Sequence, residues 1–527
     1  MAVRYKSSTR RKSRPHVFQK PRGVLHPRVQ TVGPEHFGIV CVDCAKARSK
    51  MMLVDFYGHV LIEPTTIAHN RFSLKTAVQN VRDAMARHKI EDGIVVVERT
   101  GRYHKVVQRT FTKAGFEVRV VHPFATKQFR QPADPGNKTD DTDLFAMFRA
   151  TTCGFGLSEP KPDPLLVRVQ LLARYRRSLV RNRVTIQLKM HEHLEACMPG
   201  YSRCVSDLFD SEVAMWVAKN LGSAQAIADV GVMELVRRLS QAGVRKNVPI
   251  VEKIVAWAGS APAADEPASL HHRFFLEWDE DQISKLRRIE RLEVELAELL
   301  VLTPYVLLLA LPGIGVVSAA EFAGEAGPMD RYPNARAITG RAGLYPSRYQ
   351  SDEVDRRDGK LIRCANRDLR YALMMIADNL LKCNEYFRVR SASWKQQDKD
   401  PRDIRVKVAG RFSRIAFQVV GGRQVYRHPC AQQRDYILEK LLDFCIEHKI
   451  PPEQRRRILN AAADQLPQTA RREEAIPLQD KLARVRKHRG AGPLSLGEIL
   501  PELLARLGVT LVISNESGES DLTGRPS

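Results

Sequence analysis

The sequence predicts an α/β unit with a mixed sheet near the N-terminus, followed by a long, mainly α-helical remainder. Two observations lead to this prediction. Between His36 and Val121, short runs rich in Val, Ile and Phe alternate with helical patterns. From Pro164 onward the apolar residues recur at helical spacing, and a chain of 527 residues is too long for one ordinary core. We therefore expect several structural units.

The composition predicts a nucleic-acid partner. The formal net charge is +24, and a protein this basic associates with phosphate polymers or anionic membranes. A membrane span is not expected, because the longest apolar run, from Leu299, is broken by Pro304 and Pro312. Residues 1–35 predict a basic, disordered, phosphate-seeking tail, since they contain no apolar signal segment. Nine scattered cysteines form no disulfide framework, which predicts a reduced, cytoplasmic protein.

The order of the N-terminal elements predicts a ribonuclease H-like (RuvC-like) fold over residues 36–163. HFGIVCVDCAK and SKMMLVDFYGHVLIEP form three strands in a meander with a turn at Gly58-His59. A helix, the strand GIVVVE, a second helix and the strand FEVRVV follow in that order. Three antiparallel strands followed by alternating helices and parallel strands are typical of that fold.

Four acidic residues stand at corresponding ends of these elements. In GNKTDDTDLFAMFR, Asp140 and Asp143 are three positions apart, so their β-carbons lie roughly 5 to 6 Å apart on one helix face. An N-terminal cap with acids that complement the helix dipole is the alternative explanation. Asp43 ends the first strand and Glu98 ends the fourth, and a buried acid requires a partner. We expect the four carboxylates to converge on magnesium or manganese.

Residues 164–300 predict a helical coiled-coil region. Two heptad stripes recur there, and Asn182 falls on the first as a polar register residue. The stripes predict pairing with each other or with another subunit, and a plain helical bundle is the alternative. The stripes consist of Leu172, Tyr175, Leu179 and Ile186, and of Ile289, Leu292, Leu296 and Leu299.

Residues 301–428 predict an α-helical domain with a candidate phosphate-binding turn. LPGIGVVSAAEF, from Leu311, fits a helix-hairpin-helix whose backbone amides at Gly313 and Gly315 grip a phosphate. An ordinary tight connection between helices is the alternative. An Arg-rich polar loop then separates two helical segments, and residues 429–527 form a C-terminal extension to which the sequence assigns no role.

Taken together, these motifs resemble a family of insertion-sequence transposases with an N-terminal DEDD, RuvC-like domain and a C-terminal transposase domain that carries a signature serine. The members of this family are understood as bridge-RNA-guided serine recombinases. The resemblance covers roughly residues 37–428. It rests on GIVCVDCAK at Gly38, ERTGRYHK at Glu98, KTDDTD at Lys138, LPGIG at Leu311 and GLYPSRYQSDEVDRRDGKLIRCANRDLR at Gly343.

The resemblance implies a metal-binding tetrad of Asp43, Glu98, Asp140 and Asp143 and a nucleophile at Ser351. In the family's mechanism the serine hydroxyl attacks a DNA phosphodiester and forms a phosphoserine, assisted by the metal site. The implied partners are donor and target DNA and a structured guide RNA. A tetramer built as a dimer of dimers, with tetrad and serine from different subunits, and a nucleoid location in a bacterium or archaeon are also implied.

Two positions depart from the family pattern. The family usually has Ser-Gly at the nucleophile, but Asp352 follows Ser351 here, and Ser347 is the rival nucleophile. The family's Lys-x-Gly-Asn becomes Arg363-Cys364-Ala365-Asn366. We assign Arg363, Asn366 and Arg370 to phosphate binding, and the alternative is that they cap or solvate a helix.

Two other functional classes remain open from the sequence. The first is a RuvC-like, metal-dependent junction nuclease that uses water in place of serine. The second is a non-catalytic scaffold that binds nucleic acid through the hairpin turn and the arginine-rich helix. Strand breakage and its dependence on Ser351 distinguish the three classes.

Overall fold

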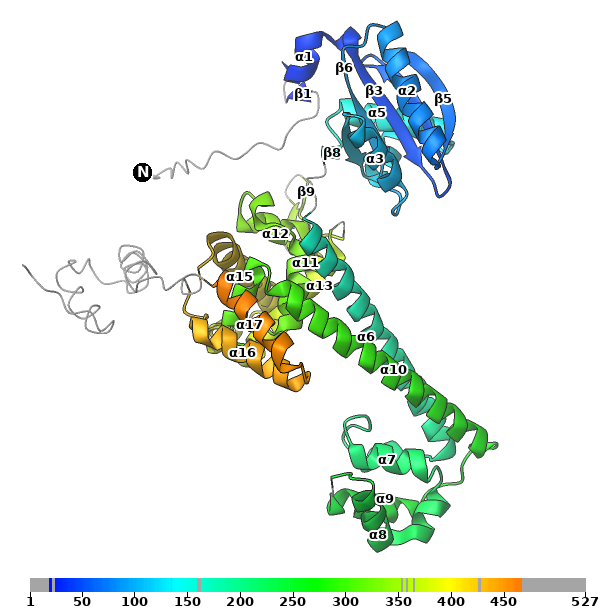
Figure 1. Cartoon of the computed structure of the whole chain (residues 1–527), viewed down its shortest axis with the longest axis vertical. Helices are drawn as coiled ribbons and strands as arrows, with labels where there is room; N and C mark the ends of the chain where they lie inside the picture. Colours follow the sequence, from blue (N-terminus) through cyan, green and yellow to red (C-terminus); the bar gives the residue numbers. More distant parts are fainter. Residues whose placement is uncertain are drawn as a thin grey trace, which may run out of the picture. The chain divides into compact units, whose positions relative to one another are not determined.

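The computed structural model describes residues 19–20, 24–133, 135–158, 163–245, 247–351, 354–356, 359–363, 365–424 and 428–466. The chain divides into two compact units, residues 1–167 and 168–527 (Figure 1). No helix in the described part of the chain combines the length and the apolar character needed to cross a membrane.

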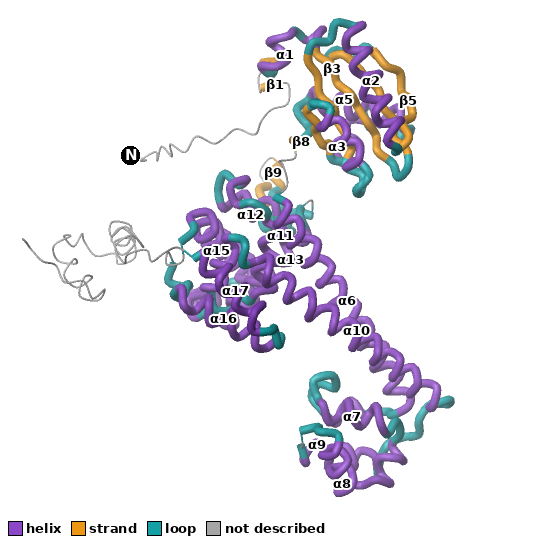
Figure 2. The backbone as a smooth tube through the Cα atoms, in the orientation of Figure 1, coloured by secondary structure: helices purple, strands orange, loops and turns teal. Residues whose placement is uncertain are grey.

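The first unit contains the predicted mixed sheet (Figure 2). Its strand order is β5-β4-β3-β6-β7-β8. The first three strands form the expected antiparallel meander, β6 and β7 are parallel to β3, and the short β8 was not predicted. The strands are β3 Phe37–Cys44, β4 Arg48–Asp55, β5 Val60–Ala68, β6 Asp92–Glu98, β7 Glu117–Val121 and β8 Leu157–Ser158.

Helices cover both faces of this sheet, and the strand alternation decides which side chain meets which helix. Val40 and Val42 of β3 pack into one core with helices α2 (Arg71–Arg87) and α3 (His104–Lys113). Ile39 and Cys41 pack into the other core, with α4 (Pro123–Arg130) and α5 (Asp140–Thr152). Because side chains alternate along a strand, Asp43 projects on the α5 face. The ribonuclease H-like fold predicted from the sequence is confirmed.

Part of the expected disordered tail is folded. Residues 27–32 form helix α1 (Pro27–Val32), followed by the short 3₁₀ helix η1 (Pro34–His36). The Arg28 guanidinium donates to both carboxylate oxygens of Asp92, at 2.8 and 2.6 Å, and to Glu117. The sequence prediction was wrong for this stretch because these carboxylates lie far along the chain. Strands β1 (Gln19–Lys20) and β2 (Val24–Leu25) precede α1, and residues 1–18 lie outside the described part.

The second unit is built around two long helices that lie side by side, α6 (Pro164–Cys197) and α10 (Ala268–Leu300) (Figure 1). Arg176 of α6 pairs with Glu293 of α10 at 2.6 Å. The buried stripe residues follow the predicted heptads, and they include Leu179, Ile186, Ile289, Leu296 and Leu299. By contrast, Tyr175 and Asn182 are exposed, so Asn182 does not set the register within this pair.

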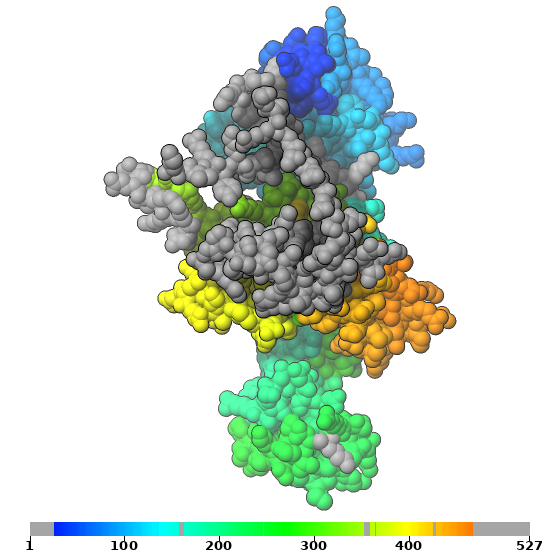
Figure 3. Space-filling view, turned by 90° about the vertical axis from the view of Figure 1, so that its left-hand side faces the viewer, coloured from blue at the N-terminus to red at the C-terminus, as the bar shows by residue number. Residues whose placement is uncertain are grey.

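A small helical lobe closes the far end of this helix pair (Figure 3). Its core also takes in residues from the ends of α6 and α10; within this core Tyr201 is fully buried and donates to the carbonyl oxygen of Ala214 at 2.8 Å. The elements of the lobe are η2 Tyr201–Cys204, α7 Glu212–Asn220, α8 Ala224–Gln241 and α9 Val248–Ala258.

The rest of the unit is a helical domain packed around η3 (Pro304–Ala310). Every residue from Val306 to Leu311 is fully buried, so η3 is the centre of this core. The described part of the C-terminal extension packs against it as two helices. The remaining elements are α11 Val316–Ala326, η4 Met329–Arg331, α12 Ala335–Arg341, β9 Tyr349–Ser351, β10 Val354–Arg356, α13 Arg367–Cys383, α14 Glu385–Gln396, α15 Pro401–Gly422, α16 Arg434–Glu447 and α17 Pro452–Gln465.

One lysine of α16 joins the C-terminal helices to this core. The Lys440 ammonium donates to the carbonyl oxygens of Leu309, Leu311 and Ile314 at 3.1, 3.0 and 2.9 Å. All three ammonium protons therefore form hydrogen bonds with backbone carbonyls of the LPGIG turn and of the residues just before it. Burial lowers the pKa of Lys440 to about 8, so the side chain is charged at pH 7.

We predict that Lys440→Met destabilises the second unit, because three carbonyl oxygens lose their donor while the apolar stem is kept. The expected decrease in melting temperature is about 5 °C at pH 7, measured by calorimetry. Lys253→Met, which changes an exposed lysine of α9, is the control. Equal melting temperatures for the two variants would contradict the prediction.

Candidate active site

Asp43 and Glu98 are brought together by the parallel pairing of β3 and β6. Val42 of β3 is in register with Val97 of β6, so the next residue on each strand is the acid. β3 is apolar and buried up to Val42, β6 is apolar and buried from Ile94 to Val97, and both acids are half-buried. In parallel strands the carboxyl ends lie at the same edge, so the register alone places these two carboxylates side by side.

Helix α5 supplies the other two predicted acids from across that edge. Thr139 caps the helix by accepting from the backbone amide of Thr142 at 3.2 Å, as the capping explanation expected. Asp140 in the first turn is exposed, whereas Asp143, one turn further, is buried. Asp141 is turned toward the sheet, where it pairs with Lys50 of β4 at 2.6 Å. Both explanations of the crowded aspartates are therefore compatible.

The electrostatics of Asp43 link it to the other three predicted acids. Burial and the negative charges of Glu98, Asp140 and Asp143 together raise the pKa of Asp43 to about 6, while Lys138 partly offsets them. A carboxyl group whose pKa is raised by three neighbouring carboxylates is stabilised by an added cation. The donor set consists of hard oxygens, which fits a divalent ion such as magnesium.

Arg130 is the residue of this site that the sequence did not indicate. It is the last residue of α4, a helix missed in the loop before α5. Its guanidinium donates to Asp143, and both side chains are almost completely buried. With Asp143 held in this way, no three His, Cys, Asp or Glu side chains of the described residues form a ready-made metal cage. The His-Pro pair at 122–123 was the available signal, since Pro favours the first turn of a helix.

Ser351 lies in the second unit, on a β-hairpin between α12 and α13. It is the last residue of β9 and pairs with Val354, the first residue of β10. The side chain is exposed. Asp352, the departure from the family pattern, and Cys364 lie outside the described residues. We call residues 344–361, which contain this hairpin, the serine arm; Ser351 is the last residue of its first strand.

Ser347 lies at the base of the same arm. Its amide donates to the carbonyl of Lys360 at 2.9 Å, and its carbonyl accepts from the amide of Gly359 at 3.2 Å. The Ser347 hydroxyl lies so close to Gly359 that a Cβ there would collide with it. The two candidate serines thus differ in position, with Ser351 near the tip and Ser347 among the strand-like contacts that close the arm.

Two of the three residues assigned to phosphate binding make contacts within the protein. Asn366 caps α13 by accepting from the amides of Asp368 and Leu369, both at 3.0 Å, which is the alternative that the sequence left open. Its amide group also donates to the buried Glu325 at 3.2 Å. Arg363 is exposed in the described structure.

Arg370 holds the base of the serine arm. Its guanidinium donates to the carbonyl oxygens of Ala342 and Gly343, at 2.8 and 3.3 Å, and to that of Ile362. These carbonyls lie before and after the arm, so one side chain ties its two ends together. Gly343 has a φ of +64°, and a Cβ there would collide with this guanidinium.

The glycines of the LPGIG turn have different roles. Gly313 has a φ of +94°, and a Cβ on it would lie 2.7 Å from the carbonyl oxygen of Asn379, so it allows close packing against α13. Gly315 is exposed and caps α11, but its amide already donates to the Ser318 hydroxyl at 3.0 Å. The turn joins a 3₁₀ helix to an α-helix. Phosphate binding by this turn stays a prediction.

Comparison with protein families agrees with this geometry. A model of the DEDD transposase domain matches residues 40–199, and a model described as "Transposase IS116/IS110/IS902 family" matches residues 305–391. Over these two regions, which make up less than half of the chain, the sequence is similar to this transposase family. The first match includes the four converging acids, and the second includes the LPGIG turn and the serine arm of the transposase. A search of curated proteins found no match.

We predict that Asp43→Asn stabilises the metal-free transposase at neutral pH. The folded-state pKa of Asp43 is raised to about 6, so the folded protein favours the protonated carboxyl group. The contribution of Asp43 to the free energy of unfolding is therefore complete below the unfolded pKa of about 3.9 and is lost as the pH rises through about 6. The variant should therefore melt higher than the unmodified protein at pH 7 in a chelator, and the difference should vanish near pH 4.

The control for charge removal is Asp83→Asn, which changes an exposed carboxylate of α2. It is expected to shift the melting temperature by no more than about 2 °C. A variant at Asp43 that melts at or below the unmodified protein at pH 7 would contradict the convergence of the four carboxylates.

Proposed function

We propose that this transposase excises and inserts a mobile DNA element through Ser351, assisted by magnesium or manganese held at Asp43, Glu98, Asp140 and Asp143. The observation that carries the proposal is the register of β3 and β6, which sets Asp43 beside Glu98 at one edge of the sheet; burial and the charges of Glu98, Asp140 and Asp143 raise the pKa of Asp43 there. The exposed position of Ser351 near the tip of the arm is the supporting observation, since a nucleophile must reach a phosphodiester.

In the proposed reaction the Ser351 Oγ attacks phosphorus, forms a phosphoserine bond and displaces one DNA hydroxyl. The Oγ proton leaves with a base or solvent, and the displaced oxygen takes up a proton. The freed hydroxyl then attacks the phosphoserine of the partner strand and regenerates the serine. A bound divalent ion supplies charge stabilisation for the nucleophilic and leaving oxygens. Release of Asp143 from Arg130 is the step that completes the carboxylate set.

The tetrad and the serine belong to different compact units of the chain, 1–167 and 168–527. This division supports the proposal that a site is composed of a tetrad from one subunit and a serine from another, in a dimer of dimers. The net charge of +24 supports binding of both DNA and a structured guide RNA.

We predict that Ser351→Ala abolishes the covalent protein–DNA adduct while binding of DNA persists. The adduct is measured by denaturing gel and mass spectrometry with a DNA substrate carrying the element's own ends, guide RNA and magnesium. Ser347→Ala, four residues earlier on the same arm, is the matched control and should keep the adduct.

Loss of the adduct in Ser347→Ala, with the adduct retained in Ser351→Ala, would identify Ser347 as the nucleophile. Cleavage by both variants without any adduct would identify a junction nuclease that uses water. No cleavage by the unmodified protein, with binding intact after all four acids are replaced, would favour the non-catalytic scaffold.

We also predict that magnesium raises the melting temperature of the unmodified protein, because it binds only the folded tetrad. Glu98→Gln should abolish this increase, and Glu63→Gln on β5 should retain it. Calorimetry across a magnesium titration measures the effect. An identical magnesium response in Glu98→Gln would exclude Glu98 as a ligand.

A further inference from the structure

A second cationic site lies in the helical domain, apart from the serine and the tetrad. It is a pocket of about 270 Å³ between α12, α14 and α15. The lining is basic, with one aromatic ring and one hydroxyl, and no carboxylate takes part. The lining residues are Ala335, Arg336, Thr339, Leu344, Trp394, Lys407, Gly410, Arg411 and Arg414.

The cations of this pocket are not neutralised by the protein. Arg336, Lys407, Arg411 and Arg414 line it, and Arg390 lies beside it, yet none of the five forms an ion pair within the described residues. In contrast, Arg405 on the same helix is paired with Asp378 through two hydrogen bonds. Five unpaired cations around one hollow repel one another, so an anion bound there is favoured.

Two guanidinium groups of this cluster have a buried donor atom without an acceptor. The Nε atoms of Arg390 and Arg411 are buried without a hydrogen-bond partner. Burial lowers the pKa of Arg411, and the charges of Arg390 and Arg414 act in the same direction. A buried donor without an acceptor is costly, and a phosphate oxygen is an acceptor that relieves this cost.

Aromatic rings position these cations. Arg390 and Lys407 lie over the ring of Trp394, at 5.6 and 5.8 Å from its centroid, and Arg411 lies 5.5 Å from the centroid of Tyr386. Cation–π contacts of this kind hold long side chains in place without cancelling their charge. The cluster is therefore preorganised, which reduces the entropy lost when a ligand binds.

The pocket is close to the serine arm along the chain. Leu344 lines it, and Ser351 is the seventh residue after Leu344, a span of at most about 23 Å. One strand of a duplex rises 3.4 Å per nucleotide, so this span corresponds to at most about seven nucleotides. A strand held at the pocket is thus within reach of the serine.

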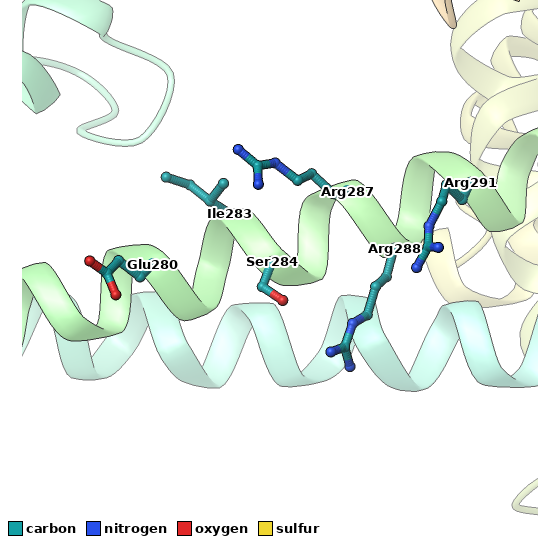
Figure 4. A pocket seen from close by; sticks show the side chains of 6 residues that line it. All are labelled: Glu280, Ile283, Ser284, Arg287, Arg288 and Arg291. Atoms are coloured by element: carbon teal, nitrogen blue, oxygen red, sulfur yellow. The ribbon is translucent and has the colours of Figure 1, made fainter.

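A larger hollow of about 520 Å³ beside α10 is a weaker candidate. Its arginines, Arg287, Arg288 and Arg291, come from one helix, and Figure 4 shows Arg287 pointing away from Arg288. They do not converge on a common point. The pocket between α12, α14 and α15, by contrast, is lined by cations from two helices, α12 and α15, and by Trp394 of α14.

We propose that the pocket between α12, α14 and α15 binds the phosphodiester backbone of the DNA strand that is cleaved, a few nucleotides from the cleavage position. The pocket thereby aligns that strand with the serine arm. This assignment rests on the proposed transposase function for the identity of the strand. Its binding chemistry requires only DNA phosphates, so the two can be tested separately. Most of the lining lies beyond residue 391, where the second family match ends.

The test is a comparison of DNA affinity between Arg414→Gln and Arg402→Gln. Both side chains are exposed arginines of α15 and only Arg414 lines the pocket, so the charge change is matched and the core is untouched. Two further variants extend the series: the double variant Arg411→Gln with Arg414→Gln, and the single variant Trp394→Leu. The full-length protein is titrated against fluorescent duplex DNA, and against a structured RNA, at several salt concentrations.

We expect the double variant to bind duplex DNA about tenfold more weakly, with the slope of log affinity against log salt reduced by about 1 to 2. Arg414→Gln should show a smaller loss of the same kind, and Arg402→Gln should bind like the unmodified protein. Ser351→Ala, measured in parallel, should lose the adduct and keep full affinity.

Three results would overturn the proposal. Unchanged DNA affinity and salt slope in Arg414→Gln and in the double variant would exclude the pocket and leave the transposase function standing. A loss confined to RNA would assign the pocket to RNA in place of DNA. A failure of the unmodified protein to bind DNA would overturn both the pocket and the proposed function.

Discussion

The parallel pairing of β3 with β6 is the constraint on which the candidate site depends. It is fixed by apolar residues, since Val42 and Val97 are fully buried neighbours, yet its consequence is electrostatic. The first residue beyond that pair on each strand is an acid at the same edge of the sheet. Hydrophobic burial thus holds Asp43 beside Glu98, and burial together with the repulsion between carboxylates raises the pKa of Asp43.

Arg130 offsets part of that repulsion from the opposite side. It neutralises Asp143, the most deeply buried of the four acids, and Lys50 performs the same role for Asp141. Burying an acid without a partner is strongly unfavourable, so a cation from a neighbouring element lets the crowded helix α5 pack on the sheet. At the proposed metal site, a metal ion and Arg130 would compete for the Asp143 carboxylate.

The second unit combines a rigid base with an exposed arm. Arg370 joins the two ends of the serine arm, and Asn366 links the start of α13 to the buried Glu325. Arg174 of α6 also binds Glu325, at 2.6 Å. The arm therefore emerges from a base connected to the long helix pair. The unpaired cations of the pocket lie beside that base, where Leu344 belongs to both features.

The sequence by itself determined the strands β3 to β7 and the helix that bears Asp140 and Asp143, because these follow from local periodicity, and the strand ends led to the prediction that the acids converge. It did not reveal Arg130 or the fold of residues 27–32, because both depend on partners distant in the chain. Only the tertiary structure decided that Arg370 and Asn366 support the arm, and that cations from α12 and α15 line one pocket. Side-chain partners of this kind depend on packing between elements, which carries no periodic signal.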